Sequence, residues 1–191
     1  MWWARLLNVI SGLLSGGAAP AAATSYESIA TSNPSSGTSI TFSSIPQTYK
    51  HLQIRGIGRT DRGNVGDVIY MRFNGDTGSN YRAHELWANG SSVSSYDQGL
   101  SSYMAFDTPL TGGSTGSNIF GAFVIDILDY TNTNKNKTVR MLDGYDSNGA
   151  GQISFCSGLW MNTAAVTSIT LPISFGQMQS GTQFALYGVK G

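Results

Sequence analysis

From residue 38 onward, apolar and polar residues alternate in short runs that are separated by clusters of Gly, Asn, Asp and Ser. In the segment 166–175, four apolar side chains at alternate positions share one face: Ile169, Leu171, Ile173 and Phe175. A period of two is typical of a β-strand that packs one face on a core. The pattern predicts strands at 38–42, 49–57, 67–73, 81–88, 119–130, 137–145, 152–160, 166–175 and 182–190.

The segment 119–130 differs from the others because apolar residues occupy both of its faces. Phe123, Ile125 and Ile127 point one way, whereas Val124, Leu128 and Tyr130 point the other. A strand of this kind is expected to be covered on both sides. We expect a second sheet on one side and a subunit or loop on the other.

Turn signals separate the expected strands, including Asn-Gly pairs at 74–75, 89–90 and 148–149. Short strands with no helical period between them predict an all-β fold, an antiparallel two-sheet sandwich that is jelly-roll-like. The sandwich domain is expected to span residues 38–191. The polar segment 89–118 is expected to be a long loop with a short edge strand near 102–106.

The chain opens with a different pattern, MWWARLLNVISGLLSGG. Its apolar core and the alanines at 21–23 resemble a secretory signal peptide. Its apolar segment is too short to cross a membrane, which requires roughly 20 residues. Its spacing favours a short amphipathic helix at 1–17, an anchor that docks on another protein. The anchor residues would be Trp2, Trp3, Leu6, Leu7, Ile10, Leu13 and Leu14. Residues 18–37, rich in Ser, Ala and Gly, are expected to form a linker.

The composition narrows the range of functions. The chain has 11 basic and 11 acidic residues among 191, so its formal net charge is zero. A neutral surface argues against binding to nucleic acid, which requires basic residues to displace counterions. Cys156 is the single cysteine, which excludes an intrachain disulfide, and its place in a strand-like run predicts a buried side chain.

The sequence contains no convincing catalytic or metal-binding motif. Residues 112–116 match G-x-S-x-G, but they lie in a flexible Gly/Ser/Thr stretch and lack the strand and helix of a nucleophile elbow. Asp126 and Asp129 fall on opposite faces of their strand and cannot act as a pair there. The turns at 73–80 and 143–149 are rich in Asp and Asn and leave a bound cation as an alternative to plain turn chemistry. We therefore expect no enzyme activity, no cofactor and no metal.

Four aromatic residues lie in or beside the long polar segment: Tyr81, Trp87, Tyr96 and Tyr103. Aromatic rings at a surface stack on sugar rings, so these residues are candidates for glycan binding. The alternative is that they pack the loop on the domain or on another protomer.

Several stretches of the chain resemble tailed-bacteriophage virion structural proteins, namely IDILDYTNTNK, SGLWM and the final FALYGVKG. The resemblance covers about residues 24–191. It implies an exterior virion component, often trimeric, without enzyme activity, and related modules occur both on capsids and at the ends of tail fibres. The first 23 residues are not part of it.

The favoured hypothesis is a capsid decoration or cement protein at the particle surface, anchored by its N-terminal segment. The alternative is a tail-fibre or receptor-binding protein that contacts host glycans. The expected partners are further copies of the chain, as a trimer, and the major capsid protein or a tail adaptor; nucleic acid and membrane are not expected.

Overall fold

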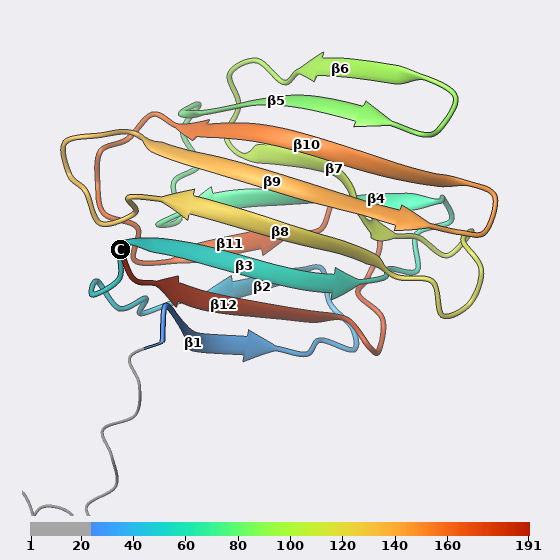
Figure 1. Cartoon of the computed structure of the whole chain (residues 1–191), viewed down its shortest axis with the longest axis horizontal. Helices are drawn as coiled ribbons and strands as arrows, with labels where there is room; N and C mark the ends of the chain where they lie inside the picture. Colours follow the sequence, from blue (N-terminus) through green and yellow to red (C-terminus); the bar gives the residue numbers. More distant parts are fainter. Residues whose placement is uncertain (1–23) are drawn as a thin grey trace, which may run out of the picture.

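The computed structural model describes residues 24–191. Within that range the chain forms two antiparallel β-sheets that face each other as a β-sandwich, with no helix (Figure 1). No helix in this part of the chain is long and apolar enough to cross a membrane. The predicted anchor helix at 1–17, with Trp2, Trp3, Leu6, Leu7, Ile10, Leu13 and Leu14, lies outside the described residues.

The larger sheet has eight strands. In spatial order they are β1 (Tyr26–Ser32), β12 (Gln183–Val189), β3 (His51–Gly58), β8 (Gly121–Leu128), β9 (Lys137–Asp146), β10 (Gly151–Trp160), β5 (Tyr81–Ala88) and β6 (Val93–Asp97). The smaller sheet has four strands, in the order β2 (Ser39–Phe42), β11 (Ile169–Pro172), β4 (Gly66–Phe73) and β7 (Met104–Thr111). Figure 1 shows the larger sheet in front of the smaller one, with β1 and β6 at its two edges.

Most connections between consecutive strands pass from one sheet to the other. Only β5–β6, β8–β9 and β9–β10 join neighbours within one sheet. Repeated crossing brings strands that are distant in the sequence together, so the core between the sheets is assembled from the whole described chain. All nine predicted strands are present, and the predicted two-sheet antiparallel fold is confirmed.

Alternating side chains build the core as the sequence predicts. On β8, Phe123, Ile125 and Ile127 are buried between the sheets, whereas the intervening residues point outward. Trp160 at the end of β10 is also buried, and its indole N–H donates to Asp76 at 2.8 Å. Burying one large apolar side chain contributes roughly 1.5–3 kcal/mol, so this layer supplies the main driving force for folding. The predicted burial of Cys156 is confirmed.

A buried lysine fastens the connections at one end of the sandwich. The Lys137 side chain is fully buried, and its ammonium group donates to the carbonyl oxygens of Asn132 (2.7 Å), Lys135 (2.8 Å) and Thr163 (2.9 Å). Burial lowers the pKa of this ammonium group. Hydrogen bonds from a charged donor are stronger than neutral ones, and these three join two separate loops.

Three strands were not predicted in full. β1 lies inside the predicted 18–37 linker, so the sandwich reaches back at least to Tyr26. The predicted loop at 89–118 contains β6 and β7, and β7 is an eight-residue strand rather than a short one at 102–106. Phe175 also differs from expectation, because it follows the end of β11 and is 64% exposed instead of lying in the core.

Candidate functional site

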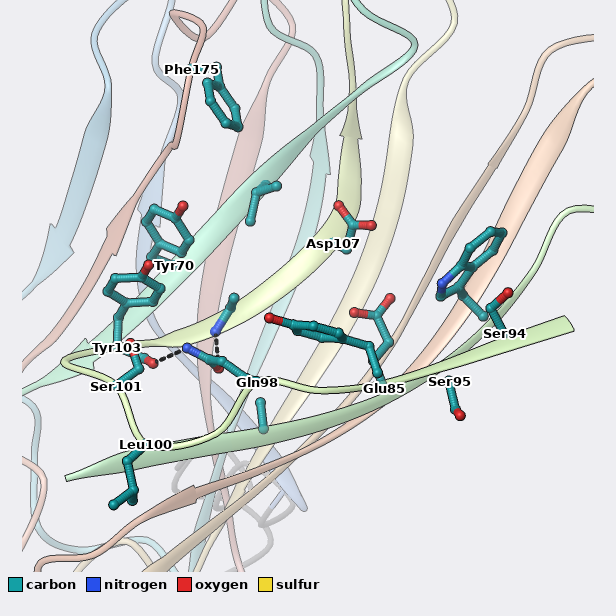
Figure 2. A pocket seen from close by; sticks show the side chains of 15 residues that line it. Tyr70, Glu85, Ser94, Ser95, Gln98, Leu100, Ser101, Tyr103, Asp107 and Phe175 are labelled. Carbon is teal, nitrogen blue, oxygen red and sulfur yellow. Dashed lines mark hydrogen bonds between the residues drawn. The ribbon is translucent and has the colours of Figure 1, made fainter. Parts of the chain in front are cut away.

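A cavity of about 660 Å³ opens where the larger sheet extends past the smaller one. The β5–β6 hairpin lies at the edge of the larger sheet, beside β7, the edge strand of the smaller sheet (Figure 1). We call this space the edge cavity. Its lining comes from β4, β5, β6 and β7, the 98–103 connection and Phe175 (Figure 2). A cavity of this size is within the range of small-molecule sites.

Three of the four predicted aromatic residues line the edge cavity: Trp87, Tyr96 and Tyr103. Trp87 follows the inward-facing alternation of β5, and Tyr96 lies directly opposite Glu85 on β6. The structure therefore brings together side chains that the sequence only placed near one long segment.

Tyr81 is the exception: it is not available for glycan binding and agrees with the alternative, packing within the domain. Its side chain is fully buried in the core, and its hydroxyl accepts from the Phe73 N–H at 3.0 Å. Burial raises the pKa of this hydroxyl to about 12. Tyr81 begins β5 on its inward face, under the smaller sheet, so its ring cannot contact a glycan.

Sequence reasoning missed two further aromatic residues of the edge cavity. The Tyr70 ring lies 4.0 Å from the Tyr103 ring, centroid to centroid, and its hydroxyl hydrogen-bonds to Ser174 at 2.8 Å. Phe175 stands at the rim, where the Arg62 guanidinium lies 3.9 Å from its ring centroid. Tyr70 could have been found, because it alternates with the buried Ile69 and Met71 and must therefore point outward.

Sequence reasoning also missed the carboxyl groups of the edge cavity. Glu85 on β5 and Asp107 on β7 both line it (Figure 2), and they lie close enough for the charge of Asp107 to raise the pKa of Glu85. Glu85 is only 7% exposed, and its Oε1 atom has no hydrogen-bond partner in the described chain. Asp107 is more exposed. The alternation of β5 contained the signal, because Ala83, Glu85 and Trp87 share one face.

A third carboxyl group, Asp143 on β9, lies behind these two. It is 4% exposed, and its Oδ1 atom has no hydrogen-bond partner among the described residues. Burial raises its pKa to about 8, and the negative charges of Glu85 and Asp107 act in the same direction, against a hydrogen bond from Ser154.

The other two carboxyl groups are affected in the same way. Burial raises the pKa of Glu85, and the negative charge of Asp107 acts in the same direction. Burial among protein atoms also raises the pKa of Asp107, against the attraction of Arg62. Carboxyl groups that share a poorly solvated site favour the neutral form. We call Glu85, Asp107 and Asp143 the acidic cluster.

The acids of the two Asp/Asn-rich turns are used by the protein itself. Asp76 accepts hydrogen bonds from Gly78, Asn80 and Trp160, and Asp146 accepts from the Asn148 N–H. In residues 24–191 no three His, Cys, Asp or Glu side chains are arranged to hold a metal ion.

The G-x-S-x-G match at 112–116 lies in the connection between β7 and β8. The Arg59 guanidinium holds this loop by donating to five oxygens, among them Thr115 Oγ1 (2.9 Å) and the carbonyls of Gly116 (2.9 Å) and Ile119 (3.0 Å). The loop is therefore fixed by backbone contacts and has no helix after it, unlike a nucleophile elbow.

A second feature is the outer face of the larger sheet. Val124, Leu142, Phe155 and Leu86 are direct cross-strand neighbours on β8, β9, β10 and β5. The next row adds Ala122, Ile153 and Val93. Leu142 (51%), Phe155 (52%) and Leu86 (53%) are about half exposed. We call these residues the apolar face.

A polar row borders the apolar face: Gln53, Asp126, Arg140, Ser157, His84 and Asp97, in cross-strand order. The second face of β8 was predicted to be covered. Within the single chain it is only partly covered, and Leu128 is 38% exposed.

Comparison with known proteins identifies no relative. No protein-family model, no curated protein and no solved structure matches this chain.

Proposed function

We propose that this chain is a non-enzymatic structural protein on the exterior of a tailed-phage virion, most simply a capsid decoration or cement protein. The observation that carries the proposal is the apolar face. Monomeric soluble proteins rarely expose large contiguous apolar surfaces, and those that occur mark interaction sites. The resemblance of IDILDYTNTNK and FALYGVKG to virion proteins supplies the context.

The apolar face suits a second copy of the same chain. The polar row beside it mixes acidic and basic side chains, Asp126 and Asp97 with Arg140 and His84. A surface with both signs of charge next to an apolar patch can complement itself across a symmetry axis. We propose a homo-oligomer, with three copies as the expected number. The jelly-roll-like classification of the sandwich belongs to the same proposal and is supported by the repeated crossing between sheets.

The place where the N-terminal segment joins the sandwich supports exterior display. It enters at β1, one edge of the larger sheet, whereas the edge cavity lies at β5 and β6, the opposite edge. If residues 1–17 attach to the major capsid protein or a tail adaptor, the edge cavity would face away from the attachment.

Oligomer formation is tested with the full chain by light scattering. Phe155→Asn and Leu142→Asn should reduce the mass to that of one chain, while circular dichroism stays unchanged because both side chains are already half exposed. Leu128→Asn is the matched control, since Leu128 lies on the same face beyond the polar row. A monomeric wild-type protein would contradict the proposed oligomer.

Copy number decides between capsid and tail. Quantitative mass spectrometry of purified particles should find hundreds of copies per virion for a decoration protein. Tens of copies or fewer would contradict the capsid location and favour the tail.

A second candidate function is a tail-fibre or receptor-binding protein that contacts host glycans, and the edge cavity favours it. Trp87, Tyr96 and Tyr103 present aromatic side chains beside polar groups in one accessible space. A glycan array probed with the wild type and with Trp87→Ala tests this function. Loss of all signals in the variant is the expected result, and equal binding by both proteins would contradict a role for the edge cavity.

A further inference from the structure

The edge cavity contains two carboxyl groups and no basic side chain. Its carboxyl groups are those of Glu85 and Asp107, and none of its lining residues is Lys, Arg or His. Two guanidinium groups lie against its aromatic residues: Arg62 is 3.9 Å from the Phe175 ring centroid and donates to the Gly66 carbonyl at 2.9 Å, and Arg72 is 5.8 Å from the Tyr103 ring centroid. The interior is therefore suited to a ligand that brings a positive charge.

One carboxylate oxygen is poised for such a ligand. Glu85 Oε1 is buried, lacks a hydrogen-bond partner and belongs to a side chain that lines the cavity. An ionised oxygen that has lost water without gaining a donor is costly. A ligand N–H at the Glu85 carboxylate, near Asp107, would supply the missing donor.

The aromatic residues that line the edge cavity can contact a cation and can also stack on a sugar ring. A cation over an aromatic face is attracted by the ring quadrupole, and Arg62 over Phe175 is an instance at the rim of this same cavity. Tyr103 packs against Tyr70 and Arg72. Trp87 and Tyr96 remain for a ligand. Ser94, opposite Trp87 on the inner face of β6, adds a hydroxyl group that matches a polyhydroxylated molecule better than the stem of a lysine (Figure 2).

We infer that the edge cavity binds a saccharide that carries a free amino group, with the ammonium held between Glu85 and Asp107 and the sugar ring against Trp87 and Tyr96. This inference rests on the second candidate function, glycan binding, and specifies its ligand. A neutral sugar would leave the Glu85 and Asp107 carboxyl groups without a positively charged partner, and N-acetylation would remove the charge that they select.

Calorimetric titration of the full chain at about pH 7 tests the inference. The probes are a glucosamine trisaccharide, the N-acetylglucosamine trisaccharide of the same linkage, a glucose trisaccharide, and a short lysine-containing peptide. The glucosamine trisaccharide should bind at least about tenfold more tightly than the other three, because a hydrogen bond to a charged group contributes about that factor.

Two isosteric variants locate the effect. Glu85→Gln and Asp107→Asn should each weaken binding of the glucosamine trisaccharide about tenfold or more, with thermal unfolding measured in parallel to show that the fold persists. Asp126→Asn is the matched control, because Asp126 lies on the outer face of β8 and does not line the cavity. It should leave the affinity unchanged.

Each other result overturns a distinct part of the inference. Equal binding of the acetylated and free trisaccharides would refute selection of the ammonium but leave glycan binding intact. Binding of the lysine peptide alone would replace the saccharide with a basic protein segment. Absence of binding by every probe, together with a silent glycan array, would refute both the inference and the receptor-binding function, whereas the copy number per virion would still test the capsid function.

Discussion

The substitution Asp143→Asn tests whether the fold keeps a buried carboxyl group protonated. Asp143 has no hydrogen-bond partner at Oδ1, and burial together with the charges of Glu85 and Asp107 raises its pKa from 3.8 to about 8. Asparagine has nearly the same shape and is never ionised. The variant therefore removes the titration without opening a cavity.

The sign of the effect follows from proton uptake. Between about pH 4 and pH 8 the folded protein keeps a proton on Asp143 that the unfolded chain releases, so the free energy of unfolding falls as the pH rises. The stabilisation is complete below pH 3.8 and is lost as the pH rises through about 8. One group contributes at most about 1.4 kcal/mol per pH unit, which is about 2.7 kcal/mol between pH 5 and pH 7.

Two other carboxyl groups with shifted pKa values do not change the free energy of unfolding between pH 5 and pH 7. Asp97, beside Arg82, and Asp129, beside Lys50 and Lys135, have their pKa values lowered to about 2 by those partners. Their stabilisation is present above pH 3.8 and is lost only as the pH falls toward 2. Glu85 and Asp107 titrate in the same direction as Asp143 but are present in both proteins.

Urea unfolding followed by tryptophan fluorescence at pH 5, 6 and 7 measures the difference. The free energy of unfolding of Asp143→Asn, relative to wild type, should rise by about 2–3 kcal/mol from pH 5 to pH 7. Parallel pH profiles for wild type and Asp143→Asn would refute the raised pKa.

Three further predictions concern the framework of the sandwich. Lys137→Met should lower the free energy of unfolding by about 3 kcal/mol, because three carbonyl oxygens lose a charged donor; urea titration measures this. Cys156 should not react with a thiol reagent in the native protein and should react at once in urea, because it is buried and its pKa is raised to about 12, first by burial; fast native labelling would contradict its burial. Arg59→Lys should make the 112–120 loop several-fold more sensitive to limited proteolysis, because lysine cannot reproduce five contacts; an unchanged cleavage rate would show that the loop is held by other contacts.

The strands that were predicted and those that were missed differ in how they are buried. Strands with one face on the core, such as β8 and β11, have the apolar period that makes them visible in a sequence. β1 and β6 are edge strands with mostly polar or small residues, so no period marks them. β7 contains Pro109, which argues against a strand except at an edge or a bulge, and β7 has both features, with an irregular register opposite Asp67–Ile69.

The edge cavity was harder to predict than the sandwich. Alternation alone places Glu85 and Trp87 on one face of β5, and Asp143 on the inward face of β9. The meeting of these side chains with Asp107 and Tyr70 depends on which strands are neighbours across the two sheets. That arrangement follows from long crossing connections, for which the local sequence contains no signal.

The three acids of the acidic cluster have two roles. Like charges in one poorly solvated site cannot all ionise, so their pKa values move apart. Asp143, the most deeply buried, takes the proton near pH 7, because burial and the charges of Glu85 and Asp107 raise its pKa to about 8, whereas Glu85 and Asp107 line the edge cavity. Asp143→Asn should therefore stabilise the protein near pH 7 and leave the affinity for the glucosamine trisaccharide unchanged, whereas Glu85→Gln should weaken it. Equal weakening by both variants would show that Asp143 is itself ionised and contributes to the charge of the cavity.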